Sequence, residues 1–150
     1  MALMVPREGD VQLLNDLLGG GSLENWNLRL FNSNITPAET DVASTYTAHE
    51  TGFTGYSAKT LTRSVGSSTW NTPVSQAPSG APWSARSQVG HSQYGSAPQQ
   101  WTCTGTGDTI YGYFITGATS GKLIMAEAFA ASRTLASGDS LSITPIFENA

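Results

Sequence analysis

Two apolar runs separated by a short polar connection constrain this chain more than any other feature. The runs span residues 109–115 and 123–129, and the connection 116–122 contains two glycines and a serine. Aromatic and β-branched side chains favour strands, and glycine permits the chain reversal between them. The stretch therefore predicts a pair of adjacent antiparallel strands.

Neither face of the first run is clearly polar. One face carries Ile110, Gly112 and Phe114, and the other carries Tyr111, Tyr113 and Ile115. Alternate side chains of a strand point to opposite sides of the sheet, so we expect protein to cover both faces of this hairpin.

Further short segments have the composition or the alternation of strands, and they lie at 24–31, 53–56, 58–62, 68–71, 84–89, 100–104 and 140–147. In the first of them Trp26, Leu28 and Leu30 alternate with polar residues, which indicates a half-buried strand. Pro145 cannot donate to a strand ladder and predicts an edge or a strand end. About eight short antiparallel strands predict an all-β fold, a β-sandwich of jelly-roll type.

One short helix is predicted before the strands. Its apolar stripe consists of Val11, Leu14, Leu17 and Leu18, and a run of glycines at 19–21 ends it. Either Asp10 caps the helix or Pro6 occupies its first turn. The simplest role of the stripe is to close one end of the β core, and the alternative is a contact between subunits.

These patterns divide the chain into two parts. Residues 1–21 form an N-terminal arm and the short helix, and residues 22–150 form the β-sandwich domain. A chain of 150 residues is long enough to bury a core without disulfides or metals. The single cysteine, Cys103, excludes an internal disulfide and is expected to be buried.

The charge content limits the kinds of partner that the protein can bind. Charged residues make up only 12% of the chain, about half of the ~25% that is typical of globular domains. Such a surface is suited to packing against other protein. The net charge of −4 and the scattered Lys and Arg residues argue against a nucleic-acid partner. No apolar run approaches the ~18 residues of a membrane span, and the apolar start is too short for a signal peptide. We therefore expect no membrane partner and synthesis in the cytoplasm.

No motif for nucleophilic or phosphate chemistry is present. The turn 117–121 places its serine one position late for a nucleophile elbow, and Gly121-Lys122 lacks the first glycine and the hydroxyl of a phosphate loop. His49 and His91 fall in predicted loops and are expected at the surface. We therefore predict no metal, no cofactor and no catalytic residue.

One acidic residue deserves a separate hypothesis. Glu127 interrupts the apolar face of the second run, and with Glu148 or Asp139 it would supply the two carboxylates of a glycoside hydrolase. Its simpler role is that of a strand-end carboxylate that meets Arg133 or solvent. The prediction is that the protein is not an enzyme.

Several segments together resemble a known family. They are an apolar arm with a short helix, followed by 28–31, 34–37, 53–60, 111–115 and 123–129. The chain resembles small structural proteins encoded among the head genes of tailed bacteriophages, and is similar in size and pattern to their jelly-roll capsid decoration, or cement, proteins. This resemblance implies a virion protein on the outer capsid surface, commonly a homotrimer, that ties major capsid proteins together. It implies no catalytic residues.

The expected interface residues are Leu3, Met4 and Val5 of the arm, together with Trp70 and Trp83 of the Gly-, Ser- and Pro-rich segment 64–98. Tryptophan is enriched at interfaces, although both tryptophans also suit the core. The alternative function is a carbohydrate- or receptor-binding module of a phage tail or fibre. In that case Trp70, Trp83 or Tyr94 would stack on sugars.

Overall fold

The computed structural model describes residues 5–19, 23–77, 88–95 and 97–149. In chain order its elements are α1 (Arg7–Leu17), β1 (Trp26–Phe31), α2 (Ala43–Thr47), β2 (Lys59–Leu61), β3 (Val74–Gln76), β4 (Val89–Gln93), β5 (Gln99–Thr102), β6 (Asp108–Gly117), β7 (Leu123–Leu135), β8 (Ser140–Ile143) and β9 (Ile146–Asn149). The described part of the chain is thus mostly β, as the sequence predicts. It has the expected N-terminal helix and a second, five-residue helix.

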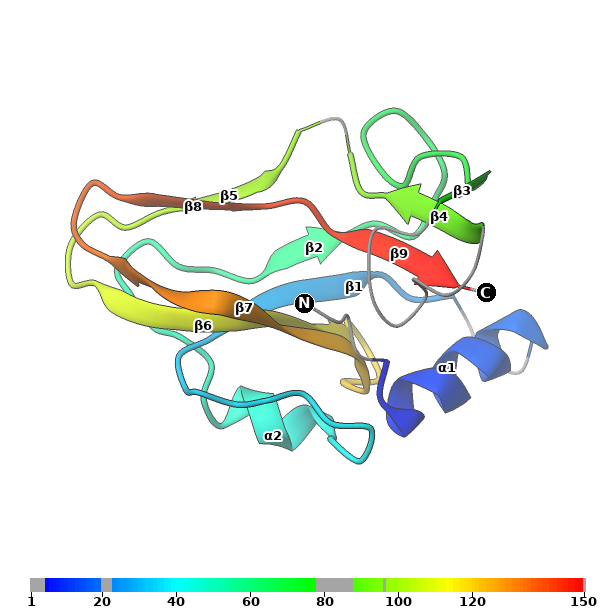
Figure 1. Cartoon of the computed structure of the whole chain (residues 1–150), viewed down its shortest axis with the longest axis horizontal. Coiled ribbons are helices and arrows are strands. Elements are labelled where there is room, and N and C mark those ends of the chain that lie inside the picture. The colour runs from blue at the N-terminus through cyan, green and yellow to red at the C-terminus, as the bar shows by residue number, and fades with distance from the viewer. Residues whose placement is uncertain (1–4, 20–22, 78–87, 96, 150) are drawn as a thin grey trace.

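The strands form three antiparallel sheets. The largest has the order β2-β1-β6-β7, and the other two are β3-β4-β9 and β5-β8. The two smaller sheets lie in one layer above the four-stranded sheet, and α2 lies on the other side of that sheet (Figure 1). The chain passes from β8 to β9, and so from one small sheet to the other, at Pro145. Proline therefore marks a strand end, as predicted.

The main core lies between the two layers. It packs Leu28 and Ile115 of the four-stranded sheet against Trp101 and Ile143 of β5 and β8. Cys103 is fully buried in the same core, as expected. These side chains supply the apolar burial that holds the layers together.

A second core covers the opposite face of the four-stranded sheet. The ring of Tyr46 in α2 lies 5.2 Å from that of Phe31 and 5.5 Å from that of Phe114, measured between centroids. All three side chains are fully buried. The prediction that protein covers both faces of the central hairpin is confirmed.

The predicted division of that hairpin into two faces is only partly right. Tyr113 and Ile115 share the main core with Ile110, which the alternation places on the other side. The cause is a bulge, since Ile110 pairs with Arg133 and Gly112 pairs with Ala128. The four residues 129–132 therefore lie opposite Tyr111 alone, and the alternation changes phase there.

Other segments differ from the expected strands. Residues 53–56 form a turn in which Gly55 has φ 98°, and β7 continues six residues beyond its expected end at Phe129. Within 68–71 only Trp70 makes strand-like bridges, to Val65 and Tyr94. Of the segment expected at 84–89, residues 84–87 lie outside the described residues.

Candidate interaction surface

The apolar stripe of α1 faces away from the β core. The exposed fractions are 69% for Val11, 56% for Leu14, 81% for Leu17 and 77% for Leu18. The expectation that this stripe closes the core is wrong. A helix that exposes its leucines normally has a partner surface, because isolated apolar side chains are common at protein surfaces but contiguous apolar patches are not.

The opposite side of α1 explains this orientation. Gly9 is buried, and Gln12, Leu13 and Asp16 are half-buried, at the i, i+3, i+4 and i+7 spacing of one helical face. A Cβ atom built on Gly9 would lie 2.3 Å from the carbonyl oxygen of Ile124. The missing side chain therefore allows the helix backbone to approach the first residues of β7 closely.

Polar contacts hold the start of the helix in this position. The Glu8 carboxylate accepts the backbone N–H groups of Leu123 at 2.8 Å and Ala43 at 3.3 Å, and Lys122 Nζ at 3.2 Å. Burial by itself raises the pKa of Glu8, but these donors outweigh burial and hold the pKa below its ordinary value. Glu8 thus links α1 to β7 and to α2.

The end of the helix is held by a second ion pair. The guanidinium of Arg63 pairs with Asp16, whose side chain is only 3% exposed. The same guanidinium lies 4.8 Å from the centre of the Trp26 ring. Arg63 therefore connects the end of α1 to the aromatic residues of the main core.

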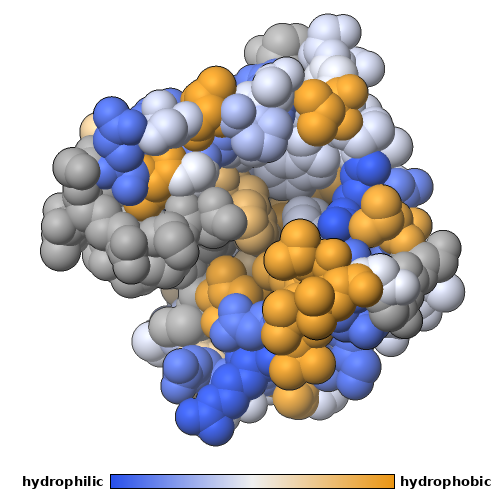
Figure 2. Space-filling view, turned by 90° about the vertical axis from the view of Figure 1, so that its right-hand side faces the viewer, coloured by the Kyte–Doolittle hydropathy of each residue, from blue (hydrophilic) through white to orange (hydrophobic). Residues whose placement is uncertain are grey.

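Beside Arg63 lies an apolar groove of about 250 Å³. Its walls include Leu23 and Val65, which are 65% and 61% exposed, and its aromatic lining consists of Trp26, Trp70 and Phe147. Figure 2 faces this end of the molecule and shows hydrophobic side chains gathered on it. Together the α1 stripe and the groove form the candidate interaction surface.

The structure describes only two of the expected interface residues, Val5 and Trp70. Trp70 lines the groove but is 8% exposed, and its ring packs edge-on against Trp26 and Tyr94 at centroid distances of 5.7 and 5.2 Å. Val5 is half-buried. Leu3, Met4 and Trp83 lie outside the described residues.

The buried positions of Trp70 and Tyr94 bear on sugar stacking. Tyr94 is 6% exposed, and its hydroxyl accepts the backbone N–H of Thr62 at 3.0 Å. Sugar stacking needs an exposed ring face, and neither residue presents one.

The carboxylates considered for hydrolysis each have a partner in the fold. Glu127 accepts the Tyr113 hydroxyl at 2.5 Å rather than meeting Arg133, and burial followed by the Glu127 charge raises the pKa of Tyr113. Asp139 accepts the backbone N–H of Ala136 at 2.8 Å, which closes the turn before β8. These contacts give both carboxylates a structural role.

His91 is not a surface residue in a loop. It lies in β4 with its side chain 13% exposed, and its Nδ1 is 3.2 Å from Oε1 of Glu148, which is 7% exposed. His49, by contrast, is exposed as expected.

Among the described residues, no group of three or more His, Cys, Asp or Glu side chains could hold a metal ion. In that same part of the chain, no helix has the length and hydrophobicity of a membrane span.

The sequence interpretation did not assign a role to Glu8, Gly9, Asp16 and Arg63. A usable signal exists for two of them, because Gly9 and Asp16 repeat with Leu13 at helical spacing on the side opposite the leucines. The partners of Glu8 and Asp16 are 115 and 47 residues away, and no local pattern marks them.

No protein-family model matches this chain, and a search of curated proteins likewise found no match.

Proposed function

We propose that this protein is a structural protein of a phage virion, a capsid decoration protein that binds the outer surface of the head and stabilises contacts between major capsid proteins. The proposal includes a jelly-roll path of the chain through its antiparallel sheets. It is supported by the resemblance described above, by the low charge content and by the mostly β fold. The single observation that carries it is the exposed α1 stripe.

The energetics of the stripe favour assembly. Fully burying one large aliphatic side chain contributes about 1.5 to 3 kcal/mol, and four such side chains are 56–81% exposed on α1. Covering them is therefore worth on the order of 4 to 8 kcal/mol, against an association cost of about 4 to 15 kcal/mol. The stripe alone gives weak pairing, and a closed assembly that repeats the contact is needed for stable association.

We assign the stripe to a second copy of this chain. Val11, Leu14 and Leu18 have the three- and four-residue spacing by which helices pack side by side in coiled coils. Identical helices around a threefold axis would bury these three side chains against one another without any other partner. The proposed state is a homotrimer, which leaves the β domain to contact the capsid.

Sedimentation velocity tests the assignment. The intact protein is expected to sediment as a trimer, and Leu14→Gln with Leu18→Gln as a monomer with an unchanged far-UV circular dichroism spectrum. Val42→Gln is the matched control, because Val42 is also exposed, at 44%, but lies outside α1. A trimer that persists in the double variant would contradict the role of the stripe.

The capsid role requires a separate measurement. The number of copies per purified virion is expected to be in the hundreds, since a decoration protein covers a repeated lattice. A few tens of copies would place the protein in a tail, neck or fibre instead, and saturable binding on a glycan array would support the carbohydrate-binding alternative.

A further inference from the structure

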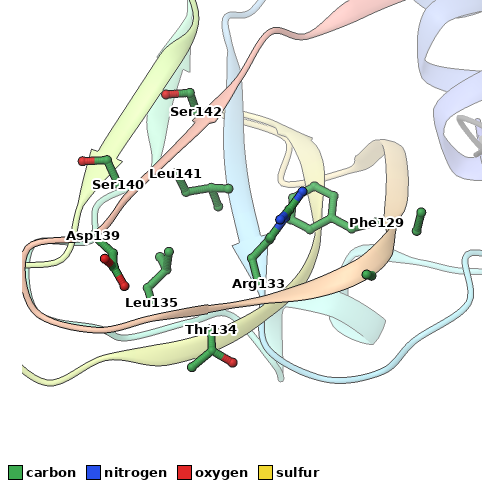
Figure 3. A pocket seen from close by; sticks show the side chains of 10 residues that line it. Phe129, Arg133, Thr134, Leu135, Asp139, Ser140, Leu141 and Ser142 are labelled. Atoms are coloured by element: carbon green, nitrogen blue, oxygen red, sulfur yellow. The ribbon is translucent and has the colours of Figure 1, made fainter.

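A groove of about 620 Å³ lies between the end of β7 and the strand β8, away from α1. Phe129, Leu135 and Leu141 supply apolar surface, and Arg133 and Asp139 supply charge. Figure 3 shows Arg133 and Leu135 projecting from β7 toward the side of β8, from which Leu141 projects. The groove thus has apolar walls and an arginine within it.

One wall of this groove is the free edge of a sheet. β7 is the last strand in the order β2-β1-β6-β7, so β6 is its only partner among the strands that the structure describes. Near its start, α1 covers β7, where Glu8 accepts the Leu123 N–H. Residues 130–134 are exposed. An uncovered edge directs backbone N–H and C=O groups outward and can pair with another strand.

Arg133 differs from every other described lysine and arginine. Arg7, Arg29, Arg63 and Lys122 pair with carboxylates, and Lys59 lies 5.6 Å from the centre of the Trp101 ring. Among the described residues, Arg133 alone has no carboxylate or ring contact of this kind. The carboxylate in the same groove, Asp139, is bonded to the backbone of Ala136. The groove therefore has an unpaired positive charge.

We propose that this groove binds an extended segment of a partner protein that carries an acidic side chain. The segment adds as a strand to the outer edge of β7 at residues 130–135, and its carboxylate binds the Arg133 guanidinium. Main-chain hydrogen bonds at a sheet edge supply affinity, and alternate side chains supply specificity. Arginine favours carboxylates because its planar fork can make two parallel hydrogen bonds to them.

The properties of the site favour an acidic peptide over nucleic acid. Nucleic acids need several clustered cations, whereas this groove has one arginine and the chain has a net charge of −4. The apolar side chains Phe129, Leu135 and Leu141 suit the alternate residues of a strand. This site is separate from the α1 stripe, and the proposal does not depend on trimer formation.

The test uses blocked seven-residue peptides of alternating Thr and Val with a central Glu or, in the twin peptide, a central Gln. Backbone amide shifts in ¹⁵N-labelled protein are expected to change at residues 130–135. The Glu peptide is expected to bind about tenfold or more tightly than its Gln twin, as for a hydrogen bond to a charged group. Arg133→Gln should remove that difference, and Arg7→Gln, which changes an exposed arginine in α1, should leave it intact.

Three outcomes would overturn the proposal. Equal affinity of the two peptides would exclude a carboxylate site, and this comparison needs no variant to fold. Equal binding of a Glu peptide whose backbone amides along one edge are N-methylated would exclude strand pairing. Sodium acetate that reproduces the same shifts at the same concentration as the peptide would identify a small-anion site only.

Discussion

The carboxylate of Glu8 accepts the backbone N–H of Leu123 at 2.8 Å and so joins the first turn of α1 to the first residue of β7. This contact, with the close approach of Gly9 to Ile124, attaches the helix through its polar side. The leucines are consequently left on the outside. The orientation of α1 thus depends on a few specific contacts rather than on burial of its apolar stripe.

Replacing Glu8 by Gln tests the strength of this attachment. The amide retains the size of the side chain but loses the charge that three donors share. We expect a loss of about 1 to 2 kcal/mol in the free energy of unfolding, measured by urea denaturation. Glu39→Gln is the control, since the pair of Glu39 with Arg7 is exposed and should contribute little. Equal effects of the two changes would contradict the role of Glu8.

The acid stability of the protein should depend on Asp108. Burial raises the pKa of this carboxyl, but hydrogen bonds from Thr51 at 2.6 Å, Asn32 at 2.9 Å and the backbone N–H groups of Thr109 and Gly52 outweigh burial and lower the pKa below its ordinary 3.8. The unfolded chain then takes up the proton first on acidification. Asp108 therefore stabilises the fold above pH 3.8, and this contribution is lost as the pH falls through the lower, folded-state pKa.

The measurement is the free energy of unfolding of the intact protein and of Asp108→Asn between neutral pH and pH 2. The variant is expected to be less stable at neutral pH and to show a shallower decline on acidification. Parallel curves for the two proteins would show that Asp108 does not titrate in this way.

The central hairpin was predictable because the composition of its two runs and of the turn between them is sufficient to indicate paired strands. Two apolar runs around a glycine-containing turn leave few alternatives to paired strands. The bulge was not predictable, since the sequence predicts that the second strand ends at Phe129 and so gives no register for residues 129–132. Their displacement opposite Tyr111 arises from pairing of Ile110 with Arg133, which is a tertiary relationship.

The helix shows the same division between local pattern and tertiary contact. Periodicity correctly predicts a short amphipathic helix, but it identifies two faces without saying which one the domain covers. The covered face contains Gly9 and Asp16, which are unfavourable in a helix interior by propensity alone. Their value lies in the contacts with Ile124 and Arg63. The apolar stripe of α1 was therefore predictable from the sequence, but its exposure was not.

Two buried tryptophans should respond differently to the same substitution. The indole N–H of Trp101 donates to the carbonyl of Ser57 at 2.7 Å, whereas that of Trp70 is buried without an acceptor in the described part of the chain. Each change to Phe removes packing, but only Trp101→Phe also leaves a carbonyl without its donor. We expect Trp101→Phe to cost about 1 to 3 kcal/mol more than Trp70→Phe in urea denaturation. Equal costs would indicate that the Ser57 carbonyl finds another donor.

Gly9→Ala sets two effects of known sign against each other. Alanine favours an isolated helix over glycine by about 1 kcal/mol, so local propensity predicts a more stable protein. At this position, however, the new Cβ would lie 2.3 Å from the Ile124 carbonyl oxygen and 3.0 Å from that of Leu123, both of which belong to backbone that cannot rotate away. Overpacking of this kind typically costs about 1 to 3 kcal/mol, so we expect the contact to decide the outcome and the helix to separate from β7.

Hydrogen exchange should then show faster exchange in α1 with unchanged protection in β6. Gly52→Ala serves as the control, because a Cβ there meets no atom within 4 Å. Unchanged protection of α1 in Gly9→Ala would mean that the Glu8 and Asp16 contacts are sufficient to hold the helix without the close approach at Gly9.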